Sequence, residues 1–180
     1  ANPGAKIVGI DLSAKSVDLA QKRLEHYGFK NCEFHAIPIE NLSELGLEFD
    51  YINADEVLYL LPDIVEGLKA MKAVLKPEGI IRTNLHSSFQ RAVYFRAQEL
   101  FKFMGLMDES PGEMEIEVVR ETMEALHDQV LIKMQTWSQR MKDSEESMLA
   151  NVLLMGDKGS TIPELFAALR EAELEFISMV

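Results

Sequence analysis

The sequence has little cysteine, histidine or tryptophan, and no long uninterrupted apolar run. Cys32 is the only cysteine, so neither an intrachain disulfide nor a thiolate metal cluster can form, which fits a reducing compartment. The 4 histidines lie far apart without the spacing of metal ligands, so we expect no metal site. No apolar stretch approaches the roughly 18 residues of a membrane helix, and the first residues lack the pattern of a signal peptide. We therefore expect a cytoplasmic protein without a membrane span.

Positive charge is also scarce. The chain has 18 lysines and arginines against 30 aspartates and glutamates, a formal net charge of -12. This charge repels phosphate backbones, and no basic cluster interrupts it, so nucleic acid is excluded as a partner. What the chain does have is 47% hydrophobic residues over 180 positions, enough for one real core. We expect a single domain spanning residues 1–180.

The first half of the sequence alternates between strand and helix patterns. Proline and glycine in Lys76-Pro-Glu-Gly79 favour a tight turn. Short β-branched runs predict strands, and apolar residues at helical spacing predict helices between them. The predicted strands are 5–11, 32–37, 49–54 and 80–85, and the predicted helices are 16–27 and 62–75. Such alternation predicts an α/β fold with a mostly parallel open sheet and helices on its faces.

From residue 89 onward the pattern changes to helix alone. Apolar residues form one stripe over 89–107, and a Pro-Gly break follows at 111–112. Between residues 116 and 141 apolar residues recur with a 3.5-residue period, which predicts one long amphipathic helix. We therefore interpret residues 89–158 as a helical insertion. A capping box at 161–164 then opens a helix to residue 172, and residues 174–180 favour a last strand.

Three segments carry a family resemblance by their order and spacing. They are Ile-Val-Gly-Ile-Asp-Leu-Ser at 7–13, Phe-Asp-Tyr-Ile-Asn-Ala-Asp-Glu-Val-Leu-Tyr at 49–59 and Val-Leu-Lys-Pro-Glu-Gly at 74–79. Together they resemble class I S-adenosylmethionine-dependent methyltransferases, closely over residues 5–85 and loosely over 161–180. The resemblance implies a Rossmann-like fold, S-adenosylmethionine as the cofactor, and methyl transfer by in-line displacement.

The resemblance also implies cofactor-binding residues. Asp11, with Leu12 beside it, matches the acid whose carboxylate accepts hydrogen bonds from both ribose hydroxyls, although it could instead cap the following turn. Pro38 stands where the family usually has an aspartate near the adenine. Ile39 could stack on the adenine ring and Glu40 could supply an acceptor, or the two could be a core residue and a solvated acid.

Ala54 and Asp55 match the segment that lines the methionine end of the cofactor, and Asp55 could equally be a helix N-cap. The family normally opens with a strand, a glycine-rich loop and a helix, and this sequence has no such segment. We expect that a unit of about 20 to 30 residues precedes Ala1. The alternative is that the first and third predicted strands pair directly.

On the acceptor side, His86 is the candidate general base, because it follows the fourth predicted strand. A structural role for His86 is the alternative. Tyr59 and Tyr94 could face the sulfonium of the cofactor or could simply be packing residues. The insertion 89–158 is rich in methionine, so it could be a lid that adapts to a small or apolar acceptor, or ordinary helical core.

Two other functions remain open at the level of sequence. An acid after a strand also binds the ribose of NAD, so the chain could be a fragment of a Rossmann-type oxidoreductase. It could also be a non-catalytic interaction module. In that case the helix predicted over 116–141 would mediate a homodimer.

Overall fold

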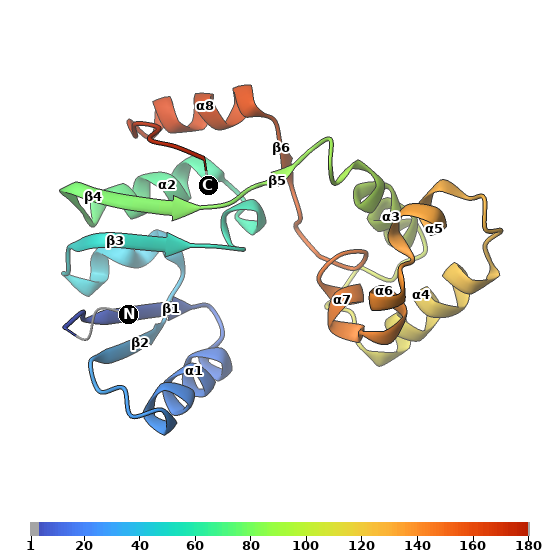
Figure 1. Cartoon of the computed structure of the whole chain (residues 1–180), viewed down its shortest axis with the longest axis horizontal. Helices are drawn as coiled ribbons and strands as arrows, with labels where there is room; N and C mark the ends of the chain where they lie inside the picture. Colours follow the sequence, from blue (N-terminus) through green and yellow to red (C-terminus); the bar gives the residue numbers. More distant parts are fainter. Residues whose placement is uncertain (1–3, 180) are drawn as a thin grey trace. The chain divides into compact units, whose positions relative to one another are not determined.

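The computed structural model describes residues 4–179 (Figure 1). The chain divides into two compact units. Unit 1 consists of residues 4–53, Asp63–Arg82 and 168–179. Unit 2 consists of Ala54–Pro62 and Thr83–Ala167, so the long helical segment groups with a short piece that follows the third strand. The interpretation of residues 89–158 as an insertion within one domain stays a prediction.

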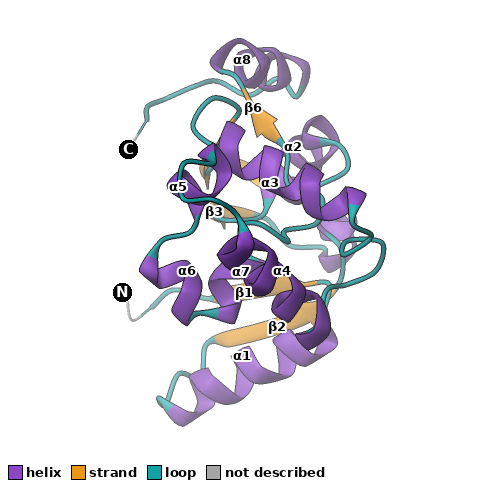
Figure 2. Ribbon diagram, turned by 90° about the vertical axis from the view of Figure 1, so that its right-hand side faces the viewer, coloured by secondary structure: helices purple, strands orange, loops and turns teal. Residues whose placement is uncertain are grey.

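Unit 1 begins with a strand–helix–strand motif, and its three elements agree with the predictions. Strand β1 runs parallel to β2, and helix α1 packs against β2 along one side of this pair (Figure 2). Ser13 caps α1 by accepting a hydrogen bond from the backbone N–H of Ser16. Gly9 lies opposite Phe34, and a Cβ at position 9 would come within 2.5 Å of the phenyl ring. The elements are β1 (Ile7–Asp11), α1 (Ala14–His26) and β2 (Cys32–Ala36).

The rest of unit 1 is built on a second pair of strands. Strand β4 pairs with β3, and Asp63 caps α2 by accepting from two backbone N–H groups. The predicted turn at 76–79 is wrong, because that stretch is extended inside β4. Lys76 Nζ lies 2.8 Å from Asp50 Oδ1 on β3, and Pro77 is tolerated because β4 has only β3 as a partner among residues 4–179. The elements are η1 (Ile39–Leu45), β3 (Phe49–Ala54), α2 (Ile64–Ala73) and β4 (Leu75–Thr83).

Two further predictions about strands are wrong. Strand β1 pairs only with β2 and β3 only with β4 in the described chain, so the direct pairing of the first and third strands is not observed. Residues 174–179 form no strand, and Val180 lies outside the described residues. Ile177 and Met179 are exposed, so no neighbouring layer holds this segment in a sheet. The capping box before α8 (Ile162–Glu171) is confirmed, because the backbone N–H of Thr161 donates to Glu164 at 2.7 Å.

Unit 2 is mainly helical, and short helices pack around its core. Helix α3 packs against α5, while α4 and α6 contact α7 (Figure 1). Phe101, Val119, Met123 and Met148 are fully buried in this core. The helices are α3 (Ala92–Phe103), α4 (Glu113–Ala125), α5 (Leu131–Thr136), α6 (Gln139–Asp143) and α7 (Glu145–Leu149).

The single long helix predicted over 116–141 is wrong, because the structure divides it into α4, α5 and α6. The chain leaves helical geometry at Leu126, whose φ and ψ are -63° and 141°. Ser138 then starts α6 by accepting a hydrogen bond from the backbone N–H of Met141. The 3.5-residue period arises because α4, with Ile116 and Met123, and α6, with Met141, are separate helices that face one core.

Residues 4–179 contain no helix that is both long and apolar enough to cross a membrane. Over the same range, no three histidine, cysteine, aspartate or glutamate side chains gather as metal ligands would.

Candidate functional site

The candidate site in unit 2 forms where two very short strands meet. Strand β5 (His86–Ser87) runs parallel to β6 (Gly159–Ser160), with His86 opposite Gly159. A Cβ on Gly159 would lie 2.7 Å from the Cα of Ser88, so only glycine permits this close approach. The approach brings Asp157 beside the imidazole, and His86 Nδ1 lies 2.6 Å from Asp157 Oδ1.

Asp157 is the most buried charged group of the site, since its side chain has no exposed surface. Its second oxygen, Oδ2, accepts from Arg91 Nη2 at 2.7 Å and from Gln98 Nε2 at 3.1 Å. Burial raises the pKa of Asp157, but the hydrogen bonds from His86, Arg91 and Gln98 lower that pKa by more, so it lies below its ordinary value. Asp157 is therefore a carboxylate at neutral pH.

Further hydrogen bonds fix the groups that surround Asp157. Arg91 Nη1 donates to Asn151 Oδ1 at 2.7 Å, and Gln98 Nε2 donates to the backbone carbonyl of Asn151 at 2.6 Å. The amide of Asn151 in turn donates to the carbonyl of Ser147. The Arg91 guanidinium lies 4.6 Å from the centre of the Tyr94 ring, in cation–π geometry. One face of Tyr94 is therefore already in contact with a cation from the protein itself.

Tyr59 covers the His86 ring. The two rings are stacked with centres 3.6 Å apart and planes 18° from parallel, and Tyr59 is only 5% exposed. The Tyr59 hydroxyl donates to Glu56 Oε2 at 2.6 Å. Burial, and then the hydrogen bond and negative charge of Glu56, raise the pKa of Tyr59 well above its ordinary value. Tyr59 therefore remains a neutral hydroxyl that donates to Glu56.

Glu56 completes the cluster on the other side of the imidazole. It has a left-handed backbone with φ of 58°, which is uncommon for a residue other than glycine. Asn84 holds this conformation, because its Oδ1 accepts from the backbone N–H of Glu56 at 2.6 Å while its amide donates to Glu56 Oε1. The Oε2 atom of Glu56 lies 3.9 Å from His86 Nε2, beyond direct hydrogen bonding.

The predicted cofactor residues of unit 1 lie at the ends of its elements. Asp11 is the last residue of β1, and its Oδ1 accepts from the backbone N–H of Ser13 at 2.8 Å, as the capping alternative requires. Leu12 is exposed. Ile39 is half-buried at the start of η1, and Glu40 beside it is exposed.

Ala54 and Asp55 lie at the end of β3 and in the turn that follows it. Ala54 is buried, and its carbonyl accepts from the Thr83 hydroxyl at 3.0 Å. Asp55 is half-buried within the turn. Both residues belong to unit 2, together with His86, Tyr59 and Tyr94.

Sequence reasoning missed the partners of His86. Asp157 lies 71 positions along the chain, and its neighbours Lys158 and Gly159 fit an ordinary loop. One usable signal was present: Arg91 and Gln98 fall at helical spacing with Tyr94 and Phe101, so they place polar groups on an inward face of the α3 segment. Polar groups in such a position require buried partners.

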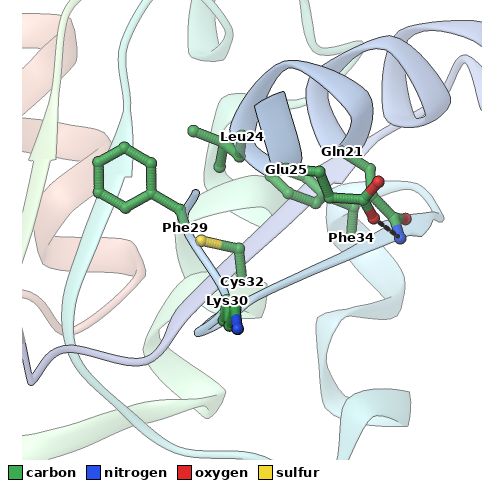
Figure 3. Close-up of a pocket in the computed structure, with 7 residues that line it drawn as sticks. All are labelled: Gln21, Leu24, Glu25, Phe29, Lys30, Cys32 and Phe34. Carbon is green, nitrogen blue, oxygen red and sulfur yellow. Dashed lines mark hydrogen bonds between the residues drawn. The ribbon is translucent and has the colours of Figure 1, made fainter. Parts of the chain in front are cut away.

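Two hollows lie in unit 1. The first has a volume of about 230 Å³ and lies between α1 and the start of β2 (Figure 3). Its one carboxylate, Glu25, already accepts a hydrogen bond from Gln21 at 3.1 Å. The second, of about 190 Å³, includes Glu40 along its wall. His86 lines neither hollow.

Comparison with known proteins identifies the family. A family model described as a methyltransferase domain matches residues 1–153. The chain belongs to the methyltransferase-domain family. This match confirms the resemblance to methyltransferases that the three sequence segments indicated.

Individual relatives match parts of this methyltransferase domain. An uncharacterised protein of Synechococcus sp. is 34% identical over 54% of the chain. The ubiquinone biosynthesis O-methyltransferase of Actinobacillus pleuropneumoniae is 30% identical over 45% of the chain, and the putative methyltransferase YqeM of Bacillus subtilis is 32% identical over 53%. These matches cover 24%, 36% and 39% of the relatives' own lengths, so each match spans well under half of the relative.

A solved structure shows the same fold. PKMT2 from Rickettsia typhi, in complex with AdoHcy, has a TM-score of 0.70 and 17% sequence identity, and the match covers 92% of this chain and 34% of PKMT2. The prediction of an α/β, Rossmann-like fold is therefore confirmed.

Proposed function

We propose that this domain binds S-adenosylmethionine and transfers the methyl group to a hydroxyl oxygen of a small acceptor. The observation that carries the proposal is the match to the methyltransferase-domain family over residues 1–153. Two findings on similar proteins support its details. PKMT2 binds AdoHcy, and relatives from three genera are named ubiquinone biosynthesis O-methyltransferases. The family match favours methyl transfer over the alternative of an NAD-linked oxidoreductase.

Asp11 fits the role of ribose ligand. Its carboxylate lies at the end of β1, exposed, and only Oδ1 takes part in the hydrogen bond to Ser13. A carboxylate has about four lone-pair positions, so it can serve the turn and two ribose hydroxyls together. Leu12, Ile39, Glu40, Ala54 and Asp55 are the further cofactor contacts that we propose. S-adenosylmethionine supplies a methyl group on a positively charged sulfur, ready for displacement.

The acceptor site that we propose lies in unit 2. His86 acts as the general base, since a hydroxyl must lose its proton when it becomes an ether oxygen. Tyr59 and Tyr94 contribute aromatic surface beside it, and residues 89–158 form a lid that selects a small or apolar acceptor by shape. We also propose a cytoplasmic location, from the single free cysteine. We propose no dimer through the helical segment, because the continuous helix that would mediate it is not formed.

Titration calorimetry on the natural protein tests cofactor binding, with S-adenosylhomocysteine as the ligand. We expect micromolar binding that is lost or strongly weakened in Asp11→Ala and retained in Asp18→Ala. Asp18 is the matched control, because it is an exposed acid of the same unit that pairs with Lys22. Absence of binding in the natural protein, or equal binding by both variants, contradicts the proposed use of Asp11.

A second assay follows the labelled methyl group of S-adenosylmethionine into phenolic acceptors. We expect methyl ethers to form, and we expect His86→Gln to reduce their formation. If the natural protein binds the cofactor but methylates only amines or thiols, the hydroxyl acceptor is wrong while the methyltransferase activity stands.

A further inference from the structure

The contact between His86 and Asp157 is more than a buried ion pair. His86 Nδ1 lies 2.6 Å from Asp157 Oδ1, and the carboxylate has no exposed surface. Other donors already occupy its second oxygen, since Arg91 and Gln98 both bind Oδ2. An ionised carboxylate only accepts hydrogen bonds, so the proton in the short contact belongs to His86 Nδ1.

We propose that Asp157 is a positioning residue that holds His86 as the Nδ1–H tautomer, so that Nε2 keeps a lone pair for the proton of the acceptor hydroxyl. This inference rests on the proposed methyl transfer to oxygen. It assigns a role to a residue that no sequence motif marked. It also identifies the acceptor side of the imidazole as the edge that faces Glu56.

The orientation of the ring is fixed from two directions. Tyr59 stacks on one face of His86 with ring centres 3.6 Å apart, which opposes rotation of the imidazole about its Cβ–Cγ bond. Lys158, next to Asp157, donates its backbone N–H to the carbonyl of Tyr59 at 3.2 Å. Its ammonium group donates to the carbonyl of Pro62 at 2.6 Å. These contacts fix the position of the Asp157 carboxylate relative to the stacked Tyr59 ring.

The opposite edge of the ring is where an acceptor can bind. Nε2 lies 3.9 Å from Glu56 Oε2, and the Glu56 side chain is 67% exposed while that of His86 is 16% exposed. The charged and titratable groups around His86 are therefore Asp157 at Nδ1, Glu56 near Nε2, Tyr59 on the ring face and Arg91 behind Asp157. A hydroxyl placed between Nε2 and Glu56 can donate to either.

The proton and electrons balance in the proposed step. The acceptor oxygen forms a bond to the methyl carbon, and the electron pair of the broken carbon–sulfur bond stays on sulfur. The hydroxyl proton moves to His86 Nε2. The imidazolium that results keeps its Nδ1–H bond to Asp157, whose negative charge stabilises it.

Nitrogen-15 NMR of the imidazole tests the tautomer in the natural protein without any cofactor. We expect the His86 signals of an Nδ1-protonated ring at a pH where the ring is neutral. An Nε2-protonated ring in the natural protein overturns the proposal, whatever the behaviour of any variant. This measurement does not depend on methyl transfer, so it separates failure of the Asp157 assignment from failure of the proposed function.

Asp157→Asn gives the sharper result. Arg91 attracts the amide oxygen, so the amide NH₂ faces His86 Nδ1 and makes that nitrogen an acceptor. We expect the variant to show the opposite tautomer, protonated at Nε2. Glu124→Gln is the matched control, because it makes the same chemical change in unit 2 at a carboxylate that accepts from Trp137 Nε1. A folded Asp157→Asn protein with the natural tautomer overturns the proposal.

Kinetics distinguish positioning from simple structural support. With phenol as the acceptor we expect Asp157→Asn to lower kcat about 100-fold or more, with the KM for S-adenosylmethionine changed less than about twofold. With the more acidic 4-nitrophenol, which is partly ionised near neutral pH, we expect a much smaller loss. Equal losses with both phenols overturn the role in proton acceptance.

Discussion

Unit 2 and the first motif of unit 1 differ in how completely they bury their apolar residues. In unit 2, Phe101, Val119, Met123 and Met148 have no exposed surface and pack in one cluster. In unit 1, the β1–α1–β2 motif has no buried residue in either strand or in its helix. Apolar burial is the main source of folding free energy, and a pair of strands alone is marginal in water. Unit 2 therefore has a stabilising core of its own, whereas the first motif of unit 1 buries little apolar surface.

Replacement of one phenylalanine in each unit should give the largest difference in the free energy of unfolding. Phe101→Ala should lower the free energy of unfolding by about 3 to 5 kcal/mol, because it opens a cavity in the core of unit 2. Phe29→Ala in unit 1 should cost less than about 1 kcal/mol, because Phe29 is already 49% exposed. Urea denaturation followed by far-ultraviolet circular dichroism measures both. Similar costs would show that the two units are equally well packed.

Low pH should lower the stability of unit 2, because it protonates Asp157. The pKa of Asp157 is lowered in the folded protein, so its contribution to stability is present above the unfolded pKa of about 3.9 and is lost as pH falls through the folded value. Asp157→Asn should remove this dependence and cost about 3 kcal/mol near pH 7, because the buried partner of Arg91 loses its negative charge.

Fluorescence of Trp137, which lies in the core of unit 2, measures this unfolding between pH 6 and pH 2. Glu121→Gln, at an exposed acid on α4, is the control and should keep the natural pH profile. An unchanged profile in Asp157→Asn would show that other carboxylates determine the acid sensitivity.

Asp11 should affect ligand binding in a way that no residue of the helical core does. Asp11→Ala should weaken the affinity for S-adenosylhomocysteine by about 1.5 to 3 kcal/mol, the range for a lost hydrogen bond to a charged group, and Asp11→Asn should cost less. Calorimetry gives the affinity and thermal melting gives the stability. A drop in melting temperature with unchanged affinity would make Asp11 only the cap of the turn at Ser13.

The smallest expected effect on stability belongs to Met134. Met123 is fully buried, so it is a core residue, whereas Met134 is 65% exposed on α5. Met134→Ala should change stability by no more than about 0.5 kcal/mol. If residues 89–158 form a lid, it should nevertheless change the relative rates with phenols of different size. Met179→Ala, at an exposed methionine outside residues 89–158, is the control, and identical acceptor preferences in both variants would argue against the lid.

The predictions from sequence succeeded where the signal was local. Strand β3 has the predicted bounds, and helix α8 begins at the predicted capping box of Thr161 and Glu164. Caps and strand ends depend on side chains within three or four residues, so the local sequence is enough to predict them. The identity of the family followed from segments of this kind.

The errors share a physical cause, which is dependence on distant partners. The proline and glycine at 77 and 79 predicted a turn, but pairing with β3 keeps that stretch extended. The period over 116–141 predicted one helix, since equal spacing results from one long helix or from three short ones that face the same core. Pattern alone does not distinguish these two arrangements, because both bury the same residues.

The sequence by itself determined the family, the α/β alternation of the first half, the candidate ribose acid Asp11 and the candidate base His86. Only the tertiary structure decided what surrounds His86. Asp157 meets the imidazole because Gly159 lets β6 approach β5, and Arg91 and Gln98 reach Asp157 from the α3 segment. The cost of burying a carboxylate is offset when both of its oxygens have donors, and those donors come from positions 59 to 71 residues away.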